Sequence, residues 1–536
     1  MTAPMIVVGQ PERATQNRVV ALLRDELGYA YQGNLAGRPD NRNIDAPALL
    51  AWLTGRGVEP GIAARAVAAL EAAANNATHD LYTRNRNVYE LLRYGVPVKP
   101  AQGVNTVVVH LIDWKDPEAN SFAVAEEVTI RGATTYANDK RPDVVLSVNG
   151  VVLGVLELKR STVSVASGIR QNLDSQKREF VEPYFATVQL VMAGNDTEGL
   201  RYGTTATKER YYLEWREEGA APGGGRLDAD LRSLLSKPRL LEVVHDFVLF
   251  DHGTKKLCRH NQFFGVRAAR EFLRRREGGI VWHTQGSGKS LTMVWLAKWI
   301  RENIPGARVL LVTDRTELDE QIEGVFRGVN EEVVRTTSGA DLVAKLNAPS
   351  PWLLCTLVHK FAGQAGPGDG RAVDVAKVLA ALPSNFVAKG DVYVFVDECH
   401  RTQSGEFHKA MKALLPDAVF VGFTGTPLLK ADKAKSVETF GRYIHTYKFN
   451  EAVRDRVVLD LRYEARDIEQ SLASPKKVDE WFDLKTANLT DHAKARLKQR
   501  WGTLSKVLSS RDRLARIVGD IALDFPAAPA AGRRPG

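Results

Sequence analysis

The stretch IVWHTQGSGKSLTMVWLAKWIREN, residues 280–303, decides the fold of the region around it. It opens with apolar residues typical of a strand and ends in a segment typical of a helix, so the glycine-rich part joins a strand to a helix. Gly286 and Gly288 allow backbone N–H groups to turn inward around phosphate oxygens, and the start of the helix adds a positive dipole. The stretch therefore predicts a phosphate-binding loop that holds ATP.

Two side chains of this loop have specific roles in an ATP-binding site. Lys289 reaches the β- and γ-phosphates, and Ser290 is placed to ligate Mg²⁺. His283 stands where the usual pattern has glycine, which is a departure, but the strand and helix on either side favour a nucleotide site over a chance turn. The residues expected to bind the nucleotide follow one another in the chain: Thr284, Gln285, Gly286, Ser287, Gly288, Lys289 and Ser290.

An acidic pair about 110 residues further on supports the same site. Residues 391–396 are apolar after the first, and Asp397 and Glu398 follow them directly. An acidic pair at the carboxyl end of a buried strand lies in the crevice where nucleotides bind. We expect Asp397 to hold Mg²⁺ and Glu398 to polarise the attacking water.

Strands and helices alternate after residue 240, which predicts a parallel sheet covered by helices. The expected strands are 280–282, 309–313, 352–355, 392–396 and 419–423. Before residue 240 the pattern is mixed α/β. Its first hundred residues are mostly helical, and strands are expected from residue 107 onward. The last part, 478–524, is expected to be polar and helical.

The N-terminal region contains a second candidate site, built on a hairpin. Asn149-Gly150 between the apolar runs 144–148 and 151–158 is the strongest short hairpin signal. The hairpin brings Asp143 back beside Glu157 and Lys159, which share a face because strand side chains alternate. Two carboxylates suit Mg²⁺, and the ammonium suits an attacking water or a developing phosphate charge. This P-D…E-x-K arrangement is that of a nuclease, although E-L-K at a strand end is usually a solvated edge.

The composition of the chain limits where in the cell it acts and what it binds. No apolar run is long enough to span a membrane, and the N-terminus has no signal-peptide pattern, so we expect a cytoplasmic protein with no membrane partner. The net charge of +9 fits a polyanionic partner without requiring one. Cys258, Cys355 and Cys399 form no CxxC pair, and the first two are expected to be buried apolar residues.

The region from about 241 to 460 resembles a superfamily 2 helicase-type motor. Residues 397–400 resemble the DEAD/DEAH-box motif II, and 424–427 (TGTP) resemble motif III, which couples hydrolysis to DNA. Gln262, about twenty residues before the loop, resembles the glutamine that reads adenine. Further matches are to motif Ia and the next DNA-contacting block: Thr313, Asp314, Arg315, Leu318, Gln321, Thr356 and Phe361.

From about residue 16 to 524 the chain resembles the R (restriction) subunit of type I restriction enzymes. The segments that carry this resemblance are 111–114, 141–143, 154–159, 171, 194–195, 282–290 and 397–401. His283 becomes an argument for the resemblance, since the family's loop also has the sequence W-H-T-Q-G-S-G-K-S. The family's Q-x-x-x-Y motif is matched by Gln171, but Ser175 stands where its tyrosine would be.

The resemblance implies an ATP-dependent type I site-specific deoxyribonuclease that translocates and cleaves unmethylated foreign double-stranded DNA. Its cofactors would be ATP and Mg²⁺, and its partners DNA and the modification (methyltransferase) and specificity subunits. The implied fold is a PD-(D/E)xK nuclease-like mixed α/β domain, 1–240, followed by a RecA-like domain, 241–450. Residues 451–536 would be a linker, the start of a second motor domain and a disordered tail. Asp143, Glu157, Lys159, Gln171 and Glu398 would be catalytic.

Family members continue through a second RecA-like domain, so we expect this chain to be C-terminally truncated and its ATPase to be impaired. Two alternatives to the nuclease remain. One is a DNA repair or remodelling ATPase whose N-terminal carboxylates are not catalytic. The other is a fragment that binds ATP and DNA without turnover.

Overall fold

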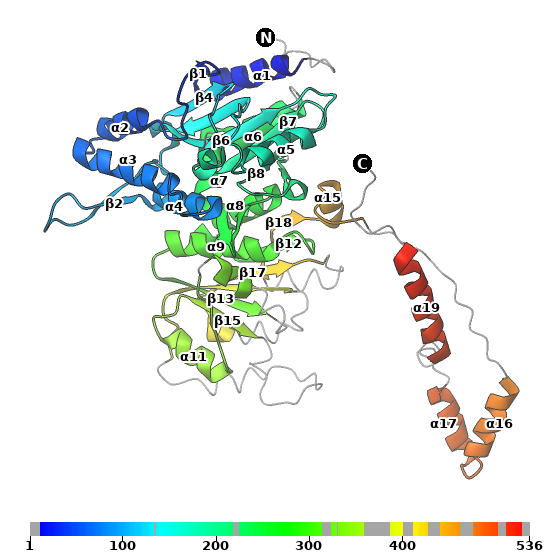
Figure 1. Ribbon diagram of the computed structural model, residues 1–536. Coiled ribbons are helices and arrows are strands. Elements are labelled where there is room, and N and C mark those ends of the chain that lie inside the picture. Colours follow the sequence, from blue (N-terminus) through cyan, green and yellow to red (C-terminus); the bar gives the residue numbers. More distant parts are fainter. Residues whose placement is uncertain are drawn as a thin grey trace. The chain divides into compact units, whose positions relative to one another are not determined.

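The computed structural model describes ten segments of the chain, which are residues 11–132, 136–217, 225–313, 323–329, 331–357, 386–399, 411–426, 440–460, 475–501 and 511–527 (Figure 1). The chain divides into two compact units, Met1–Val458 and Leu459–Gly536. Within the described segments, none of the helices has the length and apolar character needed to cross a membrane.

The second unit consists of helices in its described segments. They are α16 (Pro475–Lys485), α17 (Asp491–Trp501) and α19 (Arg511–Ala527). Several of their apolar side chains are exposed, including Trp481, Leu484 and Val518. The helical character expected for this region is confirmed.

The N-terminal part of the first unit is built on a seven-stranded mixed sheet with the order β1-β4-β5-β6-β7-β8-β9. Its strands are β1 (Ala30–Asn34), β4 (Phe122–Glu126), β5 (Val144–Val148), β6 (Val151–Leu158), β7 (Leu190–Asn195), β8 (Gly199–Gly203) and β9 (Leu213–Glu214). The pairs β1–β4 and β6–β7 are parallel and the other pairs antiparallel. A separate hairpin is formed by β2 (Val96–Val98) and β3 (Val107–Val109).

Both faces of this sheet are buried, because alternate residues of β5 enter different cores. Val144 and Leu146 pack into the large core, while Val145 packs into a smaller one with Val155 and Tyr184. The helices of this region are α1 (Glu12–Ala21), continued by a π-helical turn (Leu22–Glu26), α2 (Ala46–Gly55), α3 (Pro60–Ala74), α4 (Leu81–Tyr94), α5 (Val165–Ser175), α6 (Arg226–Leu235) and α7 (Lys237–Asp246). Single 3₁₀ turns lie at Pro117–Ala119, Glu182–Ala186 and Glu209–Tyr211.

The second sheet has seven strands, all parallel, in the order β14-β15-β13-β16-β17-β12-β18. The strands are β12 (Gly279–His283), β13 (Ala307–Thr313), β14 (Val334–Arg335), β15 (Leu353–Leu357), β16 (Asp391–Val396), β17 (Val419–Thr424) and β18 (Tyr443–Tyr447). Its helices are α8 (His260–Arg274), α9 (Lys289–Asn303), α11 (Gly339–Asn347) and α15 (Phe449–Arg454), and the hairpin β10 (Val248–Asp251) and β11 (Thr254–Leu257) precedes α8. The parallel helix-covered sheet expected from the alternation is confirmed.

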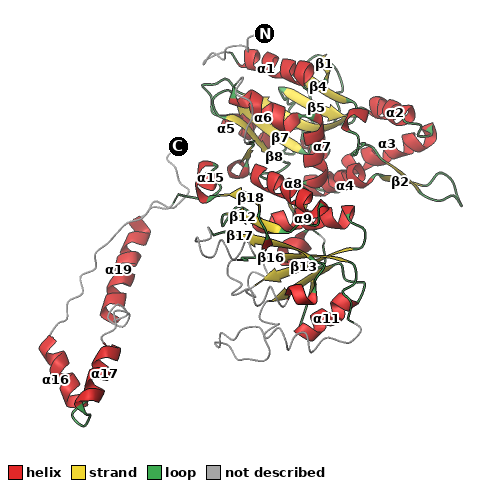
Figure 2. Cartoon of the chain, turned by 180° about the vertical axis from the view of Figure 1, so that it is seen from behind, coloured by secondary structure: helices red, strands yellow, loops and turns green. Residues whose placement is uncertain are grey.

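The two sheets of the first unit share one core, and α8 and α9 lie between them (Figures 1 and 2). Trp215 from the N-terminal part packs edge-on against Phe263 of α8, with ring centroids 5.3 Å apart. Tyr202 of β8 donates to the carbonyl of Cys258 over 2.7 Å, and Arg93 of α4 pairs with Glu302 of α9 at 2.8 Å. The helix that follows the glycine-rich loop is therefore held directly by the N-terminal part.

Sequence patterns located most of these elements but missed some edge strands. The helical character expected for the first hundred residues is found in helices such as α3, and the expected hairpin strands are also found. β1 lies in a region expected to be mostly helical, and its residues AYQGN carry no apolar alternation. β18 was also not expected, although it pairs with the strand that leads into the glycine-rich loop.

The turn between β5 and β6 gives a test of the hairpin. Gly150 has φ +82°, and a Cβ there would lie 2.8 Å from the carbonyl oxygen of Asp45. Gly253, in the β10–β11 turn, has φ +78° with nothing within 4 Å of its Cβ position. Each alanine substitution should cost about 1–2 kcal/mol for the left-handed backbone. Gly150→Ala should cost about 1 kcal/mol more because of the collision. Denaturant unfolding measures both, and equal losses would contradict the close approach.

Candidate active sites

The carboxylate cluster of the N-terminal sheet is assembled by the β5–β6 hairpin. Val144 pairs with Leu156, so Asp143, one residue before β5, lies beside the end of β6. Asn149 and Gly150 both have positive φ, at 52° and 82°, as a two-residue hairpin turn of type I′ requires. Leu156 and Leu158 are fully buried in the large core, which directs Glu157 to the other face. The hairpin therefore brings the expected residues together.

The distances within this cluster are short. Lys159 Nζ lies 3.8 Å from Asp143 Oδ2 and 4.0 Å from Glu157 Oε2. Asp143 Oδ2 accepts a 2.7 Å hydrogen bond from the backbone N–H of Leu158, which fixes its carboxylate against β6. The backbone N–H of Lys159 donates to Gly194 of β7 over 2.9 Å. Three strands thus hold the two acids and the lysine in place.

Burial makes both carboxylates costly to ionise. Glu157 is 2% exposed, and burial followed by the charge of Asp143 raises the pKa of Glu157 well above its ordinary value. Burial likewise raises the pKa of Asp143, against the hydrogen bond from Leu158 and the charge of Lys159. Within the described part of the chain, Glu157 Oε2 is buried and accepts no hydrogen bond. A buried pair of acids with an unsatisfied oxygen fits a divalent cation.

The described residues offer two acids here, and no group of three His, Cys, Asp or Glu side chains suited to a metal occurs among them. Gln171 lies on α5, which packs against β6 and β7. Gly168, one turn earlier, permits this approach, because a Cβ there would lie 3.4 Å from the Cβ of Glu157. Among the described residues, the Gln171 side chain forms no hydrogen bond with Asp143, Glu157 or Lys159. The role of Gln171 stays a prediction.

Sequence reasoning missed α1 as part of this cluster. Lys159 Nζ donates to Glu12 Oε1 over 3.2 Å, and Gln16 donates to the carbonyl of Asp143 over 3.2 Å. Gln16 also donates to Glu126 of β4, over 3.3 Å. An acid in the first turn of a helix is an ordinary sequence feature, and nothing in its spacing connects Glu12 to residues more than 130 positions away. The carboxylate cluster therefore lies against α1.

The glycine-rich loop lies between β12 and α9, as the sequence predicts. Gly286 and Gly288 have φ of 81° and 90°, which a side chain would strain. The Ser287 hydroxyl donates to the carbonyl of Thr284 over 2.6 Å, and this bond closes the loop on itself. The N-terminal amides of the long helix α9 are then presented at the loop, which suits phosphate.

Gln262 is held against this loop. It is 2% exposed, its Nε2 donates to the carbonyl of Gly288 over 2.9 Å, and its Oε1 accepts from the backbone N–H of Arg259 over 2.8 Å. A Cβ on Gly288 would lie 2.4 Å from Gln262 Nε2, so the glycine is required for this contact. The structure places Gln262 beside the loop, and adenine recognition by it stays a prediction.

The acidic pair lies at the same crevice. Asp397 follows β16 and is buried, and its backbone N–H donates to Val312 of β13 over 2.9 Å. Glu398 has φ +46°, an unusual conformation for a side-chain-bearing residue, of the kind found at functional sites. Its Oε1 lies 3.4 Å from Lys289 Nζ, and its Oε2 accepts from the N–H of Gly425 over 3.3 Å. Three of the expected motifs therefore meet at one point.

His283, the unusual first residue of the loop, is fully buried. Its Nε2 lies 2.9 Å from Nδ1 of His445 on β18, and its Nδ1 lies 3.5 Å from Nδ2 of Asn261. Burial, followed by its neighbours His445 and Lys289, lowers the pKa of His283 well below its ordinary value. Gly265 of α8 leaves the space for this ring. His283 is thus a neutral, buried side chain of β12 that contacts both β18 and α8.

Several expected residues lie outside the described segments: Asp314, Arg315, Leu318, Gln321, Phe361, His400, Arg401 and Pro427. Thr356, expected in a DNA-contacting block, is described and is 1% exposed. Its hydroxyl bonds to that of Thr336 over 2.8 Å, so in this structure it lies inside the sheet and not at a DNA-facing surface. Cys258, Cys355 and Cys399 are buried and form no disulfide within the described segments, and the burial was expected for the first two.

Two family descriptions match different parts of the chain. The type I restriction enzyme R protein N terminus matches residues 9–210, which contain the carboxylate cluster. The SWI2/SNF2 ATPase matches residues 261–495, which contain the glycine-rich loop and the acidic pair. The division between the two matches falls between the two sheets.

The curated relatives are named as endonuclease subunits of type I restriction enzymes. The chain is 26% identical over 488 residues to the "Putative type I restriction enzyme MjaIXP endonuclease subunit" of Methanocaldococcus jannaschii, covering 83% of this chain and 45% of the relative. It is 28% identical over 491 residues to the "Type I restriction enzyme HindI endonuclease subunit" of Haemophilus influenzae, covering 83% and 44%. The chain thus spans less than half the length of these relatives.

Among solved structures, a nuclease-deletion mutant of the Type ISP restriction-modification enzyme LlaGI in complex with a DNA substrate mimic aligns with 46% of this chain and 24% of its own. The identity is 13% and the TM-score 0.29, which is too low to bear on the site.

The raised pKa of Glu157 predicts a pH-dependent effect on stability without metal. Because the folded pKa lies above the unfolded value near 4.5, the stability that Glu157 contributes is present below pH 4.5 and lost as pH rises through the folded pKa. Glu157→Gln should therefore raise the melting temperature at pH 7 to 8 in metal-free buffer. Each pKa unit is worth about 1.4 kcal/mol, and the gain should shrink toward pH 4.5.

Asp246 is the matched control for this effect. Burial raises its pKa, but His245 and Arg270 outweigh burial and leave the pKa below its ordinary value. Asp246→Asn should therefore lower the melting temperature at neutral pH. Added Mg²⁺ should stabilise the wild type more than Glu157→Gln. Equal melting temperatures of wild type and Glu157→Gln across the pH range would show that the carboxylate is not held under strain.

Proposed function

We propose, since this chain belongs to the family of type I restriction enzyme R subunits, that it supplies the ATP-dependent endonuclease activity of a restriction-modification system. The single observation that carries the nuclease is the buried cluster of Asp143, Glu157 and Lys159. It lies in the same unit as a nucleotide loop with its acidic pair. The substrate would be unmethylated double-stranded DNA, translocated and then cut.

We assign the nuclease domain to residues 1–240 and the first RecA-like motor domain to 241–450. Residues 451–536 would link to a second motor half. The shared core and the pairing of Arg93 with Glu302 support a nuclease and motor that act as one body.

In the nuclease, Asp143 and Glu157 would hold Mg²⁺, and the ion would supply a lowered pKa for water and charge stabilisation on the phosphate. Lys159 Nζ lies 3.8 Å from Asp143 Oδ2 and 4.0 Å from Glu157 Oε2, so it would lie close to the oxygens of a phosphodiester held there. Its ammonium would stabilise charge that develops on those oxygens. Gln171, on the helix behind Glu157, would help to orient the lysine or the water.

In the motor, the backbone of Thr284, Gln285, Gly286, Ser287 and Gly288 would wrap the phosphates of ATP. Lys289 would leave Glu398 and move to the β- and γ-phosphates, which frees the carboxylate to polarise the attacking water. The Ser290 hydroxyl and Asp397 would hold Mg²⁺, and the loop-side position of Gln262 suits adenine.

The partners would be DNA and the modification and specificity subunits of the same system. A separate specificity subunit would recognise the target sequence. The net charge of +9 is compatible with a DNA partner.

A remodelling-type ATPase is the second candidate, since the SWI2/SNF2 match covers the motor region without the nuclease. It differs from the first candidate in one respect, which is that Asp143, Glu157 and Lys159 would have no part in its activity. The cutting experiment below separates the two candidates.

The nuclease is tested by mixing the chain with the modification and specificity subunits of its system, ATP, Mg²⁺ and unmethylated DNA. Glu157→Ala should reduce cutting about 100-fold or more, the scale of losing one group that stabilises a transition state. Glu209→Ala, which removes a surface acid paired with Arg170, is the control and should cut like the wild type. Undiminished cutting by Glu157→Ala would remove the nuclease assignment and favour the ATPase.

The nucleotide site is tested by calorimetry with ATP and Mg²⁺. Lys289→Ala should weaken ATP binding about tenfold or more, because the ammonium no longer balances the phosphates, and tenfold corresponds to about 1.4 kcal/mol. Lys345→Ala, on α11 and paired with Asp341, removes the same charge from the same sheet region without approaching the loop. The same affinity in both variants would contradict the site.

A further inference from the structure

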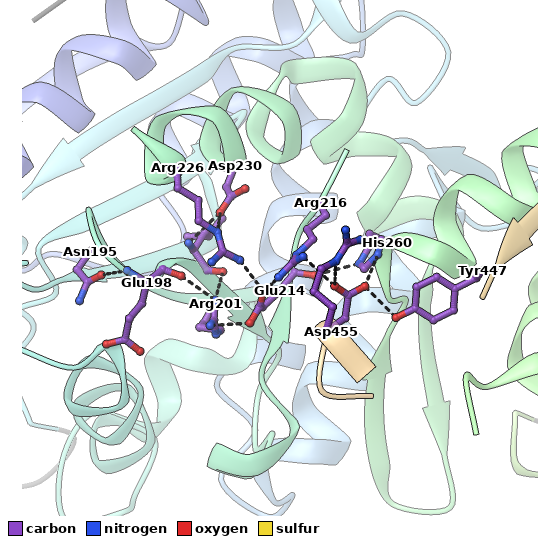
Figure 3. Close-up of polar contacts among 12 residues, drawn as sticks. Asn195, Glu198, Arg201, Glu214, Arg216, Arg226, Asp230, His260, Tyr447 and Asp455 are labelled. Carbon is purple, nitrogen blue, oxygen red and sulfur yellow. Dashed lines mark hydrogen bonds and ion pairs between the residues drawn. The ribbon is translucent and has the colours of Figure 1, made fainter. Parts of the chain in front are cut away.

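One buried carboxylate outside both sites joins the N-terminal part to the nucleotide loop. Asp455 follows α15, and its side chain is 2% exposed. Its oxygens lie 3.0 Å from Arg216 Nη1, 3.2 Å from His260 Nε2 and 3.5 Å from Arg454 Nε, and Tyr447 Oη donates to Oδ2 over 2.9 Å (Figure 3). Four donors thus converge on one acid, and three of them, Arg216, His260 and Tyr447, lie outside α15.

On one side, this acid fixes the beginning of α8. His260 is the first residue of that helix, and its neighbours Arg259 and Gln262 contact the glycine-rich loop. Arg259 Nη1 donates to the carbonyl of Gly286 over 3.4 Å, and Gln262 Nε2 donates to that of Gly288 over 2.9 Å. A shift of His260 would therefore move both contacts, since all three residues lie within one helical turn.

The segment after Asp455 also touches the loop. Val458 Cγ1 lies 3.1 Å from the place where a Cβ of Gly286 would be. The backbone N–H groups of Val457 and Val458 both donate to the carbonyl of Ala452, which keeps the segment folded back on α15. Asp455 thus anchors two separate contacts with the loop.

On the other side, Asp455 is tied to the N-terminal sheet. Arg216, its partner, also bonds Glu214 of β9 at 2.8 Å. Glu214 in turn pairs with Arg201 of β8 at 2.7 Å and with Arg226 at 2.6 Å (Figure 3). Ion pairs therefore connect Asp455, through Arg216 and Glu214, to the N-terminal sheet, which carries the carboxylate cluster.

Asp455 is held in its charged form. Burial alone would raise the pKa of Asp455, but the hydrogen bond and charge of His260, with Tyr447 and Arg216, outweigh burial and leave the pKa below its ordinary value. A buried charge with several partners is costly to leave unpaired, so its removal releases all of these contacts together.

We propose that Asp455 is a positioning residue for the nucleotide site, which it supports through His260 and the segment up to Val458, and that Arg216 makes ATP affinity depend on the N-terminal part. This inference rests on the proposed binding of ATP at the loop. Asp455 does not touch the nucleotide. It acts by fixing the two supports on either side of the loop.

The test is calorimetry of ATP with Mg²⁺ on the full chain, with a melting temperature for every variant. Asp455→Asn should weaken ATP binding about fivefold or more, the lower end of usual coupling between sites. His260→Phe should weaken it similarly. The double variant should lose little more than either single one, because both act through the same contact. Additive losses would show that the two residues act separately and would overturn the route through His260.

A matched control and a milder variant keep the test decisive. Asp391 lies at the start of β16, the strand end away from the loop, and both of its carboxylate oxygens accept from Arg276 Nη1. Asp391→Asn removes one carboxylate charge from the same sheet and should leave ATP affinity unchanged. Arg216→Gln leaves Asp455 with His260 and Tyr447, so it should remain folded and weaken ATP binding about twofold to threefold, less than Asp455→Asn.

The possible results separate this inference from the proposed function. Wild-type ATP affinity in both folded Asp455→Asn and Arg216→Gln would overturn the inference while leaving the nucleotide site intact. An equal loss in Asp391→Asn would also overturn it, because the effect would then follow from general destabilisation. Retained ATP affinity in Lys289→Ala would instead contradict the nucleotide site itself.

Discussion

The structure depends on a run of aromatic contacts between the two sheets. Trp215, Phe263, Phe247 and Trp295 are each less than 2% exposed, and successive ring centroids lie 5.3, 4.8 and 5.8 Å apart. Each such pair adds about 0.5–1.5 kcal/mol beyond the burial of its area. The run fixes α8 and α9 against the N-terminal part, and these helices carry Gln262 and Lys289. The position of the nucleotide loop relative to the carboxylate cluster follows from this packing.

The buried carboxylates discussed above fall into two groups, and the pattern of their charged partners differs. Asp143 and Glu157 share one lysine and are left with raised pKa values, which is a state that a divalent cation relieves. Glu214 and Asp455 have several cationic partners, and their pKa values stay below the ordinary range although burial opposes this. The first arrangement is suited to binding an ion and the second to holding segments together.

The sequence predicted what depends on local chemistry. The glycine-rich loop needs positive φ at Gly286 and Gly288, and the Asn149-Gly150 turn needs it at both positions, so each motif has a sequence signature. The alternation in 151–158 placed Glu157 opposite two buried leucines. Contacts between distant segments had no such signature: β18 is a short strand without strict alternation, and Glu12 and Asp455 are single acids with ordinary neighbours. Their partners were set by the packing of the sheets, which no local pattern encodes.

The two lysines of the candidate sites each lie beside an acid, but the exposure of the two acids differs. Lys159 donates to Glu12, whose side chain is 41% exposed, and Lys289 lies 3.4 Å from Glu398, whose side chain is 18% exposed. Glu12 is open to solvent, and such ion pairs contribute about 0–1 kcal/mol, so it holds Lys159 weakly, whereas Lys289 and Glu398 are both largely buried. The triphosphate of ATP carries more negative charge than one carboxylate and offers several acceptor oxygens, so it would compete well for the Lys289 ammonium. In the proposed function, the phosphates of ATP would take Lys289 from Glu398, and this exchange would release the Glu398 carboxylate to polarise water.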